Sequence, residues 1–114
     1  MADFIMWAGD DKTLQVTVQD SSGDPVDITG ATAIRWQLSK SATKRPALIE
    51  KALLDGVTVI SAPGGRFDVT LEPEDTEDLK GDYYHEAELI DSGGRVATVL
   101  TGTATINPAL IKPA

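Results

Sequence analysis

His85 is the only histidine in the chain, so it is the first residue to consider for acid–base chemistry. An imidazole changes its charge near neutral pH, and beside a serine or threonine nucleophile and an orienting acid it can act as a general base. The sequence contains no Gly-x-Ser-x-Gly segment that would position such a serine. His85 alternates with Tyr83 and Ala87, which we expect in the core, so its position favours a structural role. A small hydrolase that uses His85 is kept as an alternative.

Carboxylates are abundant, with 18 acidic residues in the chain, and a pair of them could serve glycosidic hydrolysis. Five of them fall within residues 72–78, in a segment expected to be exposed. Glu86 and Glu88 share the outward face of one predicted strand. Clusters of this kind are typical of solvated surface, so we assign no catalytic residue.

Metal and cofactor sites find little support in the sequence. Asp20, Asp24 and Asp27 could supply oxygens to a weakly bound calcium ion, but the twelve-residue spacing of an EF-hand loop is absent. The chain has no cysteine, which excludes disulfides and thiolate metal sites. The glycine-rich segments 63–65 and 92–94 do not continue into the Lys-Ser/Thr of a phosphate loop. We therefore predict no metal ion, no cofactor and no small-molecule ligand.

The charge balance disfavours nucleic acid as a partner. The formal net charge is −8, which repels phosphate backbones, and the basic cluster of Lys40, Lys44 and Arg45 is small and isolated from aromatic residues. The N-terminus lacks the basic and apolar regions of a signal peptide, and no apolar run approaches the ~20 residues that span a bilayer. We expect no membrane partner and a protein that is cytoplasmic when synthesised.

The elements that carry these residues are predicted to be β-strands, because apolar and polar residues alternate between turns rich in Gly, Asp, Ser and Pro. We predict one domain over residues 1–114, with residues 1–8 as an arm or edge strand and 107–114 as a short tail. One helical turn is expected within 72–78, and a bulge or bend at Gly102. The remaining predicted strands cover residues 13–19, 33–38, 57–60, 67–71, 83–89 and 95–106. Residues 47–54 fit both a helix and a strand period, and we interpret them as a further strand.

The stretch from Gly65 to Leu89 predicts the corner of a β-sandwich, where the chain crosses between two sheets. Leu79 can pack the crossover onto the core, Gly81 supplies a sharp bend, and the Tyr83 hydroxyl can reach back to a backbone group. We expect Tyr83→Phe to cost about 1 kcal/mol and Tyr84→Phe, in the outward phase, to be nearly neutral. The predicted fold is an all-β, immunoglobulin-like antiparallel β-sandwich of seven to nine strands, with Trp36 and Phe67 as its largest core residues.

The N-terminal arm is apolar in both strand phases. Phe4 and Met6 alternate with Ile5 and Trp7, so at least one face is expected to meet a partner or a second sheet. The alternative is an edge strand whose second face is covered by the loop from Ser39 to Leu54. These four residues are the candidate interface.

The order of turns and core positions resembles that of the immunoglobulin-like domains of tailed-phage and prophage structural proteins, including the N-terminal domains of baseplate upper proteins. The segments that carry this resemblance are Gly9-Asp10, Leu14 to Val18, Gly23 to Gly30, Gly65 to Leu71, Asp75-Thr76, Leu79 to Tyr84, and a strand opened by Gly94 that ends at Gly102.

The resemblance implies a non-catalytic virion component of the tail, neck, baseplate or head decoration. Its partners would be other virion proteins and further copies of itself, and its final location the virion. Because the baseplate proteins continue into further domains, whereas this sequence stops near Pro113, we expect a stand-alone subunit. A second hypothesis is a module that binds carbohydrate or another surface ligand, with Trp7 or Tyr84 as a stacking platform.

Overall fold

The computed structural model describes residues 3–111, and most of them lie in β-strands, so the all-β prediction is confirmed. The helical turn expected within residues 72–78 is also present, as a four-residue helix. It is the only helix among residues 3–111, and no helix there is long enough to cross a membrane. The elements are β1 (Phe4–Trp7), β2 (Lys12–Thr17), β3 (Ala33–Ser39), β4 (Ile49–Leu53), β5 (Gly56–Ser61), β6 (Arg66–Leu71), α1 (Pro73–Thr76), β7 (Gly81–Ile90) and β8 (Val96–Asn107).

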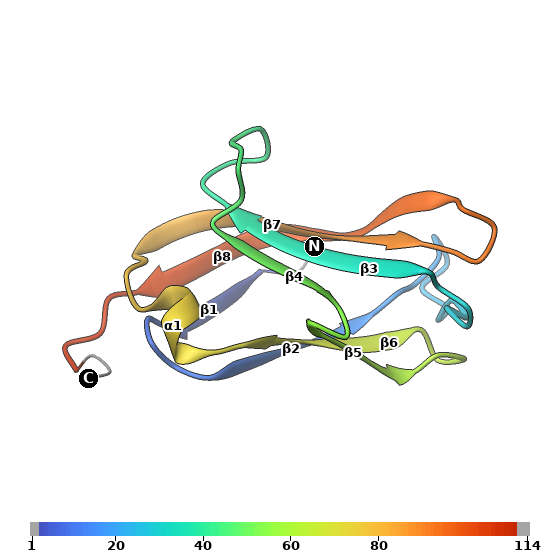
Figure 1. Ribbon diagram of the computed structural model, residues 1–114, viewed down its shortest axis with the longest axis horizontal. Coiled ribbons are helices and arrows are strands. Elements are labelled where there is room, and N and C mark those ends of the chain that lie inside the picture. The colour runs from blue at the N-terminus through green and yellow to red at the C-terminus, as the bar shows by residue number, and fades with distance from the viewer. Residues whose placement is uncertain (1–2, 112–114) are drawn as a thin grey trace.

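The eight strands form one hydrogen-bonded sheet in the order β1-β8-β7-β3-β4-β5-β6-β2. The sheet bends over at the connection of β4 to β5, so that β2, β5 and β6 lie across from β3, β7 and β8 (Figure 1). The two outermost strands, β1 and β2, leave the folded sheet nearly barrel-like but with two free edges. The number of strands agrees with the prediction of seven to nine, but the sequence did not predict that they form one continuous sheet.

Two strand pairs run parallel, so the prediction of a wholly antiparallel sheet is wrong. β1 lies parallel to β8, and β4 lies parallel to β5 over two residue pairs, Ala52 with Gly56 and Leu53 with Val57. β1 can run in either direction because no tight turn joins it to β8. At the β4–β5 bend, Leu54 and Gly56 both have positive φ, at 69° and 97°.

The core lies between the two halves of the folded sheet, where the predicted inward phases meet. Trp36 on β3 and Phe67 on β6 are fully buried, as expected for the largest core residues. Trp36 is paired with Ala87 of β7 on one side and with Lys51 of β4 on the other. The aromatic side chain therefore occupies the middle of the sheet.

Between α1 and β7, the residues predicted to form the corner make the local contacts expected of them, although the chain does not pass there between two separate sheets. Gly81 adopts a φ of 99°, a left-handed conformation that glycine reaches without steric cost. Tyr83 is buried, and its hydroxyl donates to Lys80 O at 2.9 Å and accepts from Lys80 N at 3.0 Å. Leu79 packs against the core. The tyrosine thus closes the crossover onto the strand that follows it.

The bulge in β8 lies at Val99 rather than at Gly102. Ala87 pairs with Leu100 and Glu88 with Thr98, so Val99 is the extra residue, whereas Gly102 pairs regularly with His85. The extra residue shifts the phase of everything before it. Val96 is 61% exposed, and its neighbour Ala97 in the other phase is exposed too, so neither face of β8 is covered before the bulge.

Gly65 joins the loop after β5 to the segment that follows β2. Its φ is 70°, and a Cβ atom at this position would lie 2.4 Å from Val26 O and 2.9 Å from Val18 O. Val18 N donates to Gly65 O at 2.8 Å, and Val26 N donates to Val18 O at the same distance. Only glycine allows this close approach of three backbone segments.

Candidate functional site

β1 presents one buried face and one exposed face, which divides the four candidate interface residues into two pairs. Met6 is 5% exposed and Phe4 is half-buried, whereas Ile5 is 67% exposed and Trp7 is 56% exposed. The loop expected to cover the second face does not do so, because residues 40–47 lie instead beside the outer face of β3 and β7. Ile5 and Trp7 are therefore left as an apolar surface, which we call the β1 face.

The position of β1 is fixed at both ends by hydrogen bonds. Its residues pair with Ala104 to Asn107 of β8, and Thr103 N donates to the Asp3 carboxylate at 2.8 Å. After the strand, Gly9 N donates to the hydroxyl of the buried Thr76 at 2.9 Å. The arm predicted for residues 1–8 is thus a strand from Phe4 onward, while Met1 and Ala2 lie outside the described residues. Its exposed side chains are held in one orientation.

His85 lies in the core, as its strand phase predicted. It is 1% exposed, and its Nδ1 accepts a hydrogen bond from Trp36 Nε1 at 3.0 Å. The ring of Phe4 meets it edge-on with the ring centroids 5.0 Å apart. In a serine-hydrolase triad the same nitrogen would instead donate to a carboxylate. This geometry supports a structural role for the histidine.

The acidic crossover is only partly solvated surface. Glu72 and Glu74 are exposed, and a hydrogen bond between their side chains raises the pKa of Glu72 above its usual value. Asp75 departs from the prediction: its carboxylate accepts from Glu72 N at 2.8 Å and pairs with Lys51 Nζ at 2.8 Å. An aspartate three residues into the helix can cap the first turn in this way, and here it also ties the helix to β4.

The three aspartates considered for calcium instead order two turns. Asp20 Oδ1 accepts from Ser22 N and Asp24 N at 2.9 and 3.1 Å. Asp27 Oδ1 accepts from Thr29 N at 2.8 Å, and hydrogen bonds from the Thr29 side chain and backbone hold the pKa of Asp27 below its usual value. Across residues 3–111, no three His, Cys, Asp or Glu side chains converge on a point that could hold a metal ion.

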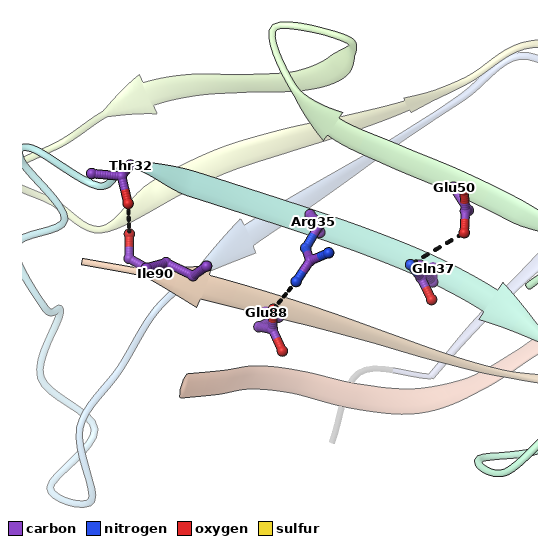
Figure 2. Close-up of polar contacts among 6 residues, drawn as sticks. All are labelled: Thr32, Arg35, Gln37, Glu50, Glu88 and Ile90. Carbon is purple, nitrogen blue, oxygen red and sulfur yellow. Dashed lines mark hydrogen bonds and ion pairs between the residues drawn. The ribbon is translucent and has the colours of Figure 1, made fainter. Parts of the chain in front are cut away.

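A charged cleft of about 640 Å³ lies on the outer face of β4, β3 and β7. Arg35 and Glu88 form an ion pair of 2.6 Å across β3 and β7, and Gln37 Nε2 donates to Glu50 Oε1 at 3.4 Å across β3 and β4 (Figure 2). The Ser39 hydroxyl donates to Lys44 O at 2.6 Å, which holds the basic loop beside the cleft. The alternation in residues 33–38 places Arg35 and Gln37 on the outward face, but the cleft was not predicted because it depends on which strands lie beside β3.

Tyr84 lies next to this cleft, in the outward phase that was predicted for it. Its hydroxyl donates to Glu86 Oε1 at 2.8 Å, and this hydrogen bond, with partial burial, raises the pKa of Tyr84. A second, smaller hollow extends from Glu86 past Tyr84 to the loop containing Lys44. Tyr84 could therefore contact a ligand in the cleft, but its ring is held by the acid beside it.

No family model matches the chain, and a search of curated proteins finds no match.

Proposed function

We propose that this chain is a non-enzymatic assembly module with an immunoglobulin-like β-sandwich fold. The two facing halves of the sheet, the buried Trp36 on β3 and the Tyr83 corner before β7 support that fold, because a core tryptophan and a tyrosine corner are typical of it. A structural role also agrees with the contacts of the titratable residues. His85 is buried and accepts a hydrogen bond from Trp36, and Asp75 caps the helix.

The observation that carries the proposal is the β1 face. Ile5 and Trp7 are two large apolar side chains, each more than half exposed, on a strand fixed by hydrogen bonds at both ends. A rigid exposed aromatic residue is a frequent anchor of protein interfaces, since it buries a large area at a small entropy cost. The β1 face is thus the best candidate for contact with another protein.

The resemblance to phage domains indicates the setting in which this module would act. We assign it to a tailed-phage or prophage particle, as a component of the tail, neck, baseplate or head decoration. Its partners are other virion proteins and further copies of the chain, and it is made in the cytoplasm before it joins the particle. A gene position among capsid, portal and tail genes would support this setting, and a position in a metabolic operon would argue against it.

The assembly function is tested by changing Ile5 and Trp7 to serine together. Both side chains point to solvent, so the double variant should keep its melting temperature while its self-association, or its binding to particle proteins, is lost. Ile60→Ser is the matched control, because Ile60 is 51% exposed on β5, on the opposite layer. Light scattering at high concentration measures the result, and a wild-type chain that stays monomeric and binds no particle protein would contradict the proposal.

A carbohydrate-binding module is the second candidate, and the charged cleft favours it. Arg35, Gln37 and Glu50 supply planar hydrogen-bonding groups, and Tyr84 lies beside them as a ring on which a sugar could stack. A glycan array would test it, with Gln37→Ala as the variant expected to lose the signal. No signal from the wild-type chain would remove this candidate.

A further inference from the structure

The upstream part of β8 has a free edge. β8 has twelve residues, and β1 covers only the last four, from Ala104 to Asn107. Within residues 3–111, the remainder of β8 pairs with β7 alone. The hydrogen bond from Thr103 N to Asp3 Oδ1 marks the end of the covered part. The backbone groups before Thr103 on this side are left for another strand.

This edge lacks the residues that usually protect free edges from pairing. Natural proteins place lysine or proline there, but β8 contains no charged residue and no proline. Its first five residues are Val-Ala-Thr-Val-Leu, three of which are β-branched and favour strands. The outer edge of β2 begins with Lys12, and the outer edge of β1 is only four residues long. The upstream part of β8 is therefore the longest stretch of unprotected edge.

The free edge also borders a groove that leaves core side chains partly uncovered. The groove has a volume of about 310 Å³ and lies between β8 and β2. Phe4, Leu14 and Leu100 line it, and all three are only partly buried. A strand added to β8 would extend the sheet across this opening and remove apolar surface from water.

We propose that the free edge of β8 pairs antiparallel with the same edge of a second copy, around a two-fold axis near Thr98 and Val99. This inference rests on the assembly function proposed above and adds to the β1 face a second contact, between copies of the chain. An antiparallel pair of identical strands is self-complementary, as a two-fold interface requires. The bulge at Val99 raises the twist of β8, so the two copies are expected to cross at an angle.

Charge explains why the occupant is a second copy although each copy carries a net charge of −8. Residues 96–102 are uncharged, so the paired segments do not repel. Antiparallel pairing that stops where β1 begins brings Arg95 of one copy beside Asp3 of the other, and the two-fold axis repeats this contact. Arg95 is exposed and takes part in none of the ion pairs found among residues 3–111.

Disulfide trapping tests the placement of the axis, because the chain has no cysteine of its own. Thr98→Cys should form a covalent dimer under mild oxidation, since paired strands bring the two residues within disulfide range. Thr70→Cys is the control: Thr70 is also exposed but lies on β6, in the other layer. A Thr98→Cys variant that cross-links no faster than Thr70→Cys would overturn the proposal.

Charge exchange tests the contact at the ends of the paired strands. Arg95→Glu and Asp3→Lys should each weaken self-association, measured by sedimentation, because each puts like charges together. The double variant should restore it. A double variant weaker than both single variants would contradict the contact between these two residues.

Thr101→Pro tests the backbone pairing itself. Thr101 and Thr103 are two residues apart without a bulge between them, so their N–H groups face the same free edge. Proline there removes a donor that the β7–β8 ladder does not use, and self-association should weaken about tenfold while the melting temperature changes little. A Pro variant that associates like the wild type would count against pairing at this edge.

The outcomes separate this inference from the assembly function. If the Ile5 and Trp7 variant dissociates the oligomer while the β8 variants do not, the assembly function stands and the β8 contact is wrong. If the wild-type chain is a monomer at all concentrations but binds a particle protein, the β8 contact is again wrong and the assembly function stands. If it does neither, both fail.

Discussion

Trp36 and His85 share a hydrogen bond in the middle of the core, from the indole Nε1 to the imidazole Nδ1 over 3.0 Å. Both side chains are almost completely buried, and their rings lie 5.8 Å apart between centroids. The bond links β3 to β7, the two central strands of one half of the sheet. It satisfies the indole donor of the largest side chain in the core, which would be costly to leave without an acceptor.

His85→Leu should therefore destabilise the protein more than His85→Gln. Leucine leaves the buried indole N–H without an acceptor, at a cost of about 2 to 3 kcal/mol, whereas glutamine can still accept through its amide oxygen and should cost about 1 kcal/mol. Urea denaturation measures both. A leucine variant as stable as the wild type would show that the bond contributes nothing.

Tyr83→Phe should cost about 1 to 2 kcal/mol, because the hydroxyl makes two hydrogen bonds to the backbone of Lys80 in a partly buried corner. Tyr84→Phe is the matched control in the next position, since it removes only one contact, with Glu86 at the surface. Its loss should be clearly smaller. Thermal denaturation of the two variants side by side decides this, and equal losses would contradict the role of the corner.

Tyr84 should make stability depend on pH in the alkaline range. Its pKa in the folded chain lies above the value of about 10 for an unfolded tyrosine, because the protonated hydroxyl donates to Glu86. The stabilisation from this group is thus complete below pH 10 and is lost as the pH rises through the folded pKa. The gap in melting temperature between wild type and Tyr84→Phe should narrow above pH 10, and a constant gap would exclude the effect.

Gly65→Ala should be among the most destabilising single substitutions, lowering the free energy of unfolding by at least about 3 kcal/mol. The new Cβ would collide with Val26 O at 2.4 Å, and alanine also disfavours the positive φ. Gly23→Ala is the control, because Gly23 has a φ of 86° but no atom within 4 Å of its would-be Cβ. It should lose only about 1 kcal/mol. Equal stabilities of the two variants, measured in urea, would refute the steric argument.

Leu54→Asn should stabilise the protein by about 1 kcal/mol. Leu54 has a φ of 69°, which strains the backbone of a leucine. Its side chain is 93% exposed, so core packing does not offset this strain. Asparagine tolerates this conformation far better than leucine. Leu48→Asn provides the comparison, since Leu48 is 54% exposed and does not have a positive φ. A gain of the same size at both positions would point to solubility rather than backbone strain.

The sequence predicted the strands and the Tyr83 corner because these depend on local pattern. Alternation placed Trp36, Phe67 and His85 inward, and a glycine before a tyrosine marked the bend at Gly81. The same reasoning did not predict the extra residue in β8, because alternation assumes a regular ladder and the residues near Val99 show no sign of a bulge. Gly102 drew the prediction of a bulge because glycine is permissive, but permissiveness does not require irregularity.

The surface sites were harder to predict because they depend on which strands become neighbours. The cleft of Arg35, Glu50 and Glu88 joins three strands whose order only the folded sheet reveals. The double role of Asp75 depends on Lys51, twenty-four residues earlier, coming within 2.8 Å of it. The apolar arm was visible from the start, but which of its two faces stays exposed follows from its parallel pairing with β8.

The parallel pairing of β1 with β8 also has a mechanical consequence. Tension applied to the two ends of the domain would draw β1 and β8 past each other along their length, because the N-terminal end of β1 lies beside Ala104 and its C-terminal end beside Asn107. Such a pull shears the whole ladder at once instead of opening its bonds one by one. We therefore expect the domain to resist stretching more strongly than its four-residue first strand would suggest.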